Sequence, residues 1–78
     1  MEPLRFFNEK KLRKQMRKRG WTDAMIWEAL ATVGIPTQGK LHPATRFVHP
    51  RTGQSVSVDD VSGEIFHVGA ARFNYDFD

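Results

Sequence analysis

The stretch that decides the fold is ATRFVH-PRTG-QSVSVD-DVSG-EIFHV, residues 44–68. Three segments, Ala44–His49, Gln54–Asp59 and Glu64–Val68, follow a period of two, which is typical of strands with one buried face. Each of the two connections is four residues long and ends in glycine, as a tight turn with a final residue at positive φ requires. The ten-residue spacing of the turns predicts a three-stranded antiparallel meander.

Two helices are expected ahead of this meander. Asn8 is suited to cap a helix that ends at Gly20, and Thr22 is suited to cap a second one. In the second helix a buried stripe is expected at positions spaced by three and four: Met25, Ile26, Ala29, Leu30 and Val33. Gly34 and Pro36 end the helical pattern.

The remaining segments complete the layout. Phe6 and Phe7 are expected to pack onto the core, and residues 37–43 are expected to form a polar loop. The tail, residues 69–78, alternates aromatic and polar residues, so it is either a fourth edge strand or a flap over the sheet.

The predicted fold class is therefore α+β, with two N-terminal helices packed on a twisted antiparallel sheet of three to four strands. Residues 1–78 are expected to form a single domain, with helices over about 8–33 and the sheet over about 44–68.

Composition narrows the functional classes. The chain contains no cysteine, which excludes disulfides and thiolate metal sites and favours a cytosolic working compartment. No apolar run approaches the roughly 20 residues of a membrane helix. Residues 1–40 hold nine Lys/Arg and four Asp/Glu, a balance of +5, whereas residues 41–78 hold three and five, a balance of −2. This asymmetry indicates a basic arm for a polyanion.

The basic arm is concentrated in residues 10–19, where seven of ten side chains are cationic. Cationic side chains this closely spaced repel one another in an isolated helix, and nearby phosphates would relieve that repulsion. The alternatives are a solvated helix face or a face that docks on an acidic protein. Trp21 is added as a base-stacking candidate. The expected RNA-binding residues are Lys10, Lys11, Lys14, Arg17, Lys18, Arg19 and Trp21.

A second cluster, residues 40–46, has the groups that RNA cleavage by its own 2′-hydroxyl needs. Histidine suits proton transfer near neutral pH, and Lys and Arg suit the charge of the transition state. The candidate catalytic residues are His42, Thr45, Arg46, Lys40 and His67. His49 is a weaker candidate.

Each candidate also has a purely structural interpretation. A lone histidine is often packed or exposed without function, and Arg46 is a possible ion-pair partner of Asp59 or Glu64. Asp60 fits turn chemistry. The three histidines lack zinc-site spacing, and no glycine-rich phosphate loop is present. No metal and no cofactor are expected.

Five motifs lie within about residues 11–69: MRKRGWT (16–22), GIP (34–36), HPATRFVHP (42–50), TG (52–53) and VDDVSGEIFHV (58–68). Together they resemble the C-terminal ribonuclease domains of colicin-type and contact-dependent growth inhibition toxins. The resemblance implies the fold shared by barnase, EndoU, colicin and RelE nucleases.

The resemblance also implies an activity and its setting. These are metal-independent cleavage of tRNA in the anticodon loop to a 2′,3′-cyclic phosphate, a cognate acidic immunity protein, and action in the cytoplasm of a target bacterium. The domain would be delivered as the C-terminal part of a larger secreted or surface-exposed protein. The alternatives are a non-catalytic RNA- or DNA-binding module and a protein-interaction domain that docks on an acidic partner.

Overall fold

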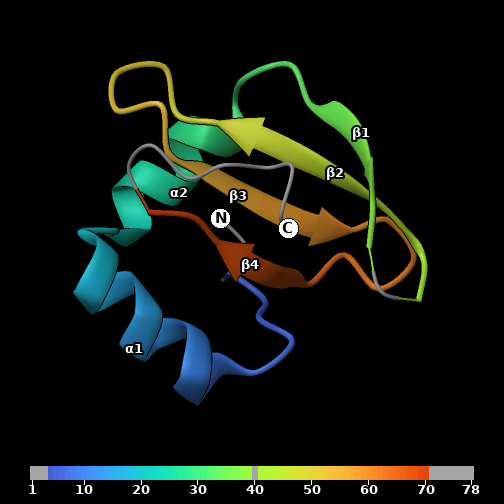
Figure 1. The fold of residues 1–78 in the computed structure, drawn as a ribbon, viewed down its shortest axis with the longest axis horizontal. Coiled ribbons are helices and arrows are strands. Elements are labelled where there is room, and N and C mark those ends of the chain that lie inside the picture. The colour runs from blue at the N-terminus through green and yellow to red at the C-terminus, as the bar shows by residue number, and fades with distance from the viewer. Residues whose placement is uncertain (1–3, 40, 71–78) are drawn as a thin grey trace.

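The computed structural model describes residues 4–39 and 41–70. Two helices come first in the chain and four strands follow (Figure 1). The elements are α1 (Glu9–Arg19), α2 (Asp23–Leu30), β1 (Ile35–Gln38), β2 (Pro43–Val48), β3 (Ser55–Asp59) and β4 (Ile65–Val68). The predicted α+β class, with the helices N-terminal to an antiparallel sheet, is confirmed.

The sheet is a meander in the order β1-β2-β3-β4, with every neighbouring pair antiparallel. The three strands expected over residues 44–68 are present within one residue of their predicted bounds. The two glycines that close the predicted turns have positive φ, 75° at Gly53 and 72° at Gly63, which a residue with a Cβ rarely adopts.

The first strand, β1, was not expected. Its sequence, Ile-Pro-Thr-Gln, falls partly in the segment interpreted as a polar loop, and it forms the edge of the sheet. Thr37 pairs with Ala44, and the Gly39 amide donates to the His42 carbonyl at 3.0 Å, so that β1 and β2 form a hairpin. The fourth strand therefore precedes the meander. The tail, which the sequence offers as a candidate fourth strand, lies outside the described residues from position 71 onward.

The helix ends follow the predicted capping residues. Asn8 Oδ1 accepts from the Lys11 amide, and Thr22 Oγ1 accepts from the Met25 amide. Gly20 adopts a left-handed conformation and ends α1. In contrast, α2 ends three residues earlier than the periodicity indicated, and Val33 is 92% exposed. Its predicted burial was wrong because the helical spacing no longer applies after Leu30.

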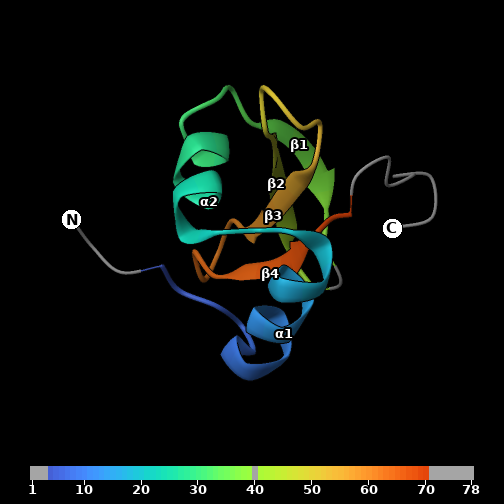
Figure 2. The same cartoon turned by 90° about the vertical axis from the view of Figure 1, so that its left-hand side faces the viewer.

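The two helices cover different parts of the sheet. Helix α2 lies against one face, over β2 and β3, whereas α1 lies beside β4 (Figure 2). The hydrophobic core fills the space between the helices and this face. The fully buried apolar side chains at its centre are Ile26, Ala29, Val56 and Val68.

The segment before α1 is attached to the edge of β4. The Ile65 amide donates to the Arg5 carbonyl, and the Phe7 amide donates to the Ile65 carbonyl, at 2.8 and 2.9 Å. Phe6 is 9% exposed and packs in the core, with the Arg13 guanidinium 4.7 Å from its ring centroid. Phe7 is 73% exposed, so the expectation that both rings pack on the core was wrong for Phe7. Consecutive side chains of an extended segment point in opposite directions.

No helix in the described part of the chain is long and apolar enough to cross a membrane.

Candidate functional site

A cleft of about 650 Å³ lies between α1 and the face of the sheet that α2 leaves uncovered. This volume falls within the range of roughly 300–1,000 Å³ that ligand sites occupy. Helix α1 and the residues before it form one wall, lined by Phe7, Asn8, Lys11, Leu12 and Gln15. Strand β1 and the turn after it form the opposite wall, lined by Thr37, Gln38, Gly39 and Leu41. Strands β3 and β4 form the floor.

Two of the predicted site residues belong to one row across this sheet face. Arg46 in β2 pairs with Ser57 in β3, and Ser57 pairs with His67 in β4. Ser57 and His67 line the cleft, and Arg46 lies one strand farther from α1. Because directly opposed residues on neighbouring strands project to the same side, the sheet brings a cation, a hydroxyl and an imidazole together.

A break in the β3–β4 register adds an aromatic ring to the floor. Ser57 is opposite His67, but Val58 is opposite Ile65, so Phe66 is an extra residue on β4. Both Phe66 and His67 line the cleft, although neighbours on a regular strand would point to opposite faces. Bulges commonly redirect a side chain in this way beside functional sites.

His42 is joined to the cleft through a carboxylate. Its Nδ1 lies 2.9 Å from Asp59 Oδ2, and Asp59 is a lining residue. The pKa of the Asp59 carboxyl is lowered, first by the Ser62 amide that donates to it, and then by the hydrogen bond with His42 and the Val61 amide. Asp59 is therefore an anion that holds one nitrogen of the His42 ring and leaves the other nitrogen for chemistry.

Thr45 does not join this group. It neighbours Arg46 on β2 and projects to the other face of the sheet, where its Oγ1 donates to Asp60 Oδ1 at 2.7 Å. The prediction that Thr45 converges on the same phosphate as Arg46 was wrong, because the register of β2 is regular here and its neighbouring residues point to opposite faces. Lys40 lies outside the described residues.

The cations of α1 divide into two stripes. Lys11, Lys14 and Lys18 are spaced by three and four, and within this stripe Lys11 is the residue that lines the cleft. Lys10 and Arg17 belong to the second stripe, with Arg13. The first stripe therefore begins at the cleft, whereas none of the three cations of the second stripe lines it.

Two arginines of α1 have structural partners. Arg13 contacts both Glu9 and Asp23, which raises its pKa chiefly through the hydrogen bond with Asp23. Arg19, which we expected to bind RNA, donates from Nη1 to the Val68 carbonyl at 2.6 Å. This contact ties the end of α1 to the end of β4.

Trp21 cannot be the stacking platform that its aromatic ring suggested. It is 5% exposed, and its Nε1 donates to the Gly69 carbonyl at 2.7 Å. Gln54 Nε2 donates to the Arg19 carbonyl at 2.7 Å and so closes the same junction between the helices and the sheet. The indole belongs to the core, and its assignment to RNA binding was wrong.

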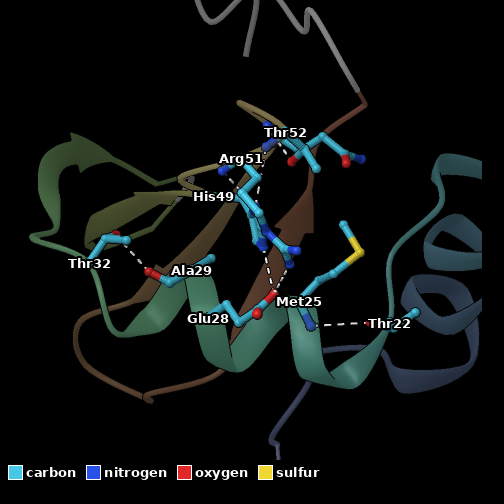
Figure 3. Close-up of polar contacts among 9 residues, drawn as sticks. Thr22, Met25, Glu28, Ala29, Thr32, His49, Arg51 and Thr52 are labelled. Carbon is cyan, nitrogen blue, oxygen red and sulfur yellow. Dashed lines mark hydrogen bonds and ion pairs between the residues drawn. The ribbon is translucent and has the colours of Figure 1, made fainter.

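His49 is also structural (Figure 3). Its side chain is buried, with Nε2 2.8 Å from Glu28 Oε1 and Nδ1 accepting from the Arg51 and Thr52 amides. The Arg51 guanidinium reaches the same Glu28 oxygen at 2.8 Å. This cluster fastens α2 to the β2–β3 turn, and no ring nitrogen of His49 is left for catalysis.

The sequence reasoning missed Asp59, Ser57 and Phe66 as site residues. The first two were within its reach, because the turn ending at Gly53 fixes the register that places Asp59 opposite Ala44 and Ser57 opposite Arg46. The position of Phe66 depends on the bulge, which has no signal in the sequence.

Within residues 4–39 and 41–70, no group of three His, Asp or Glu side chains is arranged to hold a metal ion. Comparison with protein-family models, with curated proteins and with solved structures gave no match to this chain.

Proposed function

We propose that this chain is a metal-independent endoribonuclease that cleaves RNA by attack of a 2′-hydroxyl on the adjacent phosphorus. The observation that carries the proposal is the 2.9 Å pair of His42 and Asp59 beside a cleft that also holds His67. A carboxylate that holds Nδ1 leaves Nε2 as the proton acceptor and stabilises the imidazolium that forms.

In this proposal His42 is the general base. Its Nε2 takes the proton of the 2′-hydroxyl while the bond from that oxygen to phosphorus forms. The bond from phosphorus to the 5′-oxygen breaks, and His67 gives that oxygen a proton. The products are a 2′,3′-cyclic phosphate and a 5′-hydroxyl. Arg46, in the same row as Ser57 and His67, offsets the negative charge that grows on the phosphoryl oxygens.

The cationic stripe of α1 supports a polyanionic substrate. Lys11 lines the cleft, and Lys14 and Lys18 continue along the same side of the helix. Each phosphate that these side chains neutralise would release condensed counterions, so RNA is expected to bind more weakly as salt increases.

The resemblance of the motifs supplies the biological setting of the proposal. It makes the substrate tRNA, cut in the anticodon loop, and it makes the chain a toxin domain that acts in the cytoplasm of a target bacterium. It also supplies a partner, an acidic immunity protein that covers the cleft. The charge balance of +5 in residues 1–40 supports such a partner, because complementary charge speeds association.

The same stripe supports a second candidate, a module that binds RNA without cutting it. In that case Lys11 and its neighbours would provide all of the function, and the pair of His42 and Asp59 would only secure the β1–β2 turn.

One experiment separates the two candidates. The purified chain is incubated with total tRNA in EDTA, and the products are resolved and tested for a cyclic phosphate end. Discrete fragments with that end are the expected result. Intact RNA with retarded mobility would favour the binding module, and RNA that is neither cut nor retarded would overturn both. His42→Ala is the matched control, because it removes the base and keeps the cations of α1.

A further inference from the structure

We propose that the mouth of the cleft is a nucleobase subsite in which an unpaired base stacks on the ring of Phe7. This inference rests on the proposed ribonuclease function and adds the residue that holds a base of the substrate. Phe7 is 73% exposed and lines the cleft.

Hydrogen bonds fix the backbone on both sides of the exposed Phe7. Its amide donates to the Ile65 carbonyl at 2.9 Å, and Phe6 beside it is buried in the core. On the other side, Asn8 caps α1 through the Lys11 amide. The backbone that carries the ring is therefore fixed on both sides of Phe7, which lowers the cost of ordering this segment when a base binds.

A second apolar side chain faces the same cleft from the opposite wall. Leu41, in the β1–β2 turn, is 82% exposed, and Phe66 lies on the floor between the walls. Of the large hydrophobic side chains that are exposed in the described part of the chain, Phe7 and Leu41 line this cleft and Val33, Ile35 and Val61 do not. Exposed apolar groups that gather at one cleft indicate a ligand with an apolar surface.

Polar groups in the same walls match the remaining chemistry of a base. The amide side chains of Gln15 and Gln38 line the cleft, and an amide has the donors and acceptors that base edges require. Lys11 lies one helical turn before Gln15 and supplies charge for the neighbouring phosphate. Apolar faces, amide edges and a cation match the three parts of a nucleotide, which are the face of the base, its polar edge and its phosphate.

The occupant is a base of single-stranded RNA. A base inside a duplex has both faces covered by its neighbours, whereas an unpaired base can stack on an aromatic side chain. The loop of a folded RNA presents such bases, and the cleft, about 650 Å³ in volume, opens beside the cationic stripe that would follow the backbone.

Two oligomers without 2′-hydroxyls test the subsite, because neither can be cleaved. One is a deoxy hexamer that carries bases, and the other is a hexamer of abasic sites with the same phosphates. The wild-type chain is expected to bind the hexamer with bases more tightly. Phe7→Ala should weaken that binding by about 5- to 150-fold and leave the abasic oligomer unaffected.

Three further variants sharpen the test. Phe7→Tyr keeps the aromatic face and should retain the affinity, whereas Phe7→Leu keeps apolar area without the ring and should lose most of it. Val33→Ala removes an exposed apolar side chain outside the cleft and should not change the affinity for either oligomer. The proposal is overturned if Phe7→Ala binds the hexamer with bases as wild type does, or if it weakens both oligomers equally.

Cleavage of tRNA by the wild-type chain separates this inference from the function on which it rests. If tRNA is cut and Phe7→Ala has no effect on base binding, the subsite is wrong and the ribonuclease stands. If the wild-type chain neither cuts RNA nor binds either oligomer, the ribonuclease proposal itself fails.

Discussion

The Nε2 atom of His49 lies 2.8 Å from Oε1 of Glu28, so that the end of β2 is joined to helix α2 (Figure 3). Because Nδ1 accepts two backbone amides, Nε2 is the nitrogen that carries the hydrogen and donates to Glu28. The second pair, His42 and Asp59, also joins an imidazole to a carboxylate, but it is less buried. His42 is partly exposed and next to the cleft, whereas His49 is 1% exposed. Depth therefore separates the structural His49 from His42, the residue proposed as the general base.

The buried pair predicts a stability effect. His49→Ala should lower the free energy of unfolding by roughly 1–3 kcal/mol, because the Arg51 and Thr52 amides lose their acceptor. Urea denaturation followed by circular dichroism measures the change. His42→Ala, at a partly exposed position, is the matched control and should change the free energy by about 0.5 kcal/mol or less. Equal losses in the two variants would contradict the structural role of His49.

Acid is expected to destabilise the fold through Glu28. Its pKa is lowered, chiefly by the hydrogen bond from His49 and further by the charge of Arg51. A carboxyl with a lowered pKa in the folded state contributes stability that is complete above its ordinary pKa of 4.5 and is lost as the pH falls through the folded value. The urea midpoint should therefore fall between pH 5 and pH 3.

Glu28→Gln should make that fall shallower, since an amide does not titrate. The fall in the urea midpoint that remains in this variant is expected to include a contribution from Asp59, whose pKa is lowered from 3.8. A Glu28→Gln chain whose midpoint falls as steeply as that of wild type would show that this carboxylate does not drive acid unfolding.

Under the proposed ribonuclease function, the pair of His42 and Asp59 predicts how two variants lose cleavage activity. His42→Ala should reduce the cleavage rate by about 10²–10⁴-fold while leaving RNA affinity unchanged, because it removes a proton acceptor and no cation. Asp59→Asn should also slow cleavage, since an amide nitrogen opposite Nδ1 no longer favours the productive tautomer. Its remaining oxygen can still accept from the Val61 and Ser62 amides, which preserves the turn.

Thr45→Val is the matched control for these variants. It removes a hydroxyl close in sequence to His42, but that hydroxyl bonds to Asp60 on the other face of the sheet. Single-turnover cleavage of tRNA by this variant should match that of wild type. A large loss of cleavage rate in Thr45→Val would show that Thr45 does contribute to the site. Full activity of both His42→Ala and His67→Ala would contradict the histidine mechanism.

Local signals were sufficient to predict most of the fold. The caps at Asn8 and Thr22 and the glycine turns at Gly53 and Gly63 each depend on a few neighbouring residues. Strand β1 could not be predicted in this way, because Ile-Pro-Thr-Gln has no alternation and proline removes a ladder donor. Pairing with β2 and the hairpin turn at Gly39 define it, and both are tertiary contacts.

The site was only partly predictable for the same reason. Candidate residues were chosen by chemical type within one stretch of sequence, which grouped Thr45 with Arg46 although strand geometry separates them. His42 lies in the turn before β2, and its partner Asp59 lies 17 residues away on β3. The stacking candidate Trp21 was chosen because an indole ring can stack on bases, but Trp21 is 5% exposed whereas Phe7 is 73% exposed.

The two stripes of α1 give the last prediction. The double variant Lys11→Ala and Lys18→Ala removes two cations from the side of the cleft, and the dependence of log Kd on log salt should become shallower by about one to two units. The double variant Lys10→Ala and Arg17→Ala removes the same charge from the other stripe and should change the slope by much less. Because the two double variants have the same net charge, a difference between their salt slopes reports the position of the lost cations and not their number. Equal slopes would mean that RNA contacts the whole helix rather than the face beside the cleft.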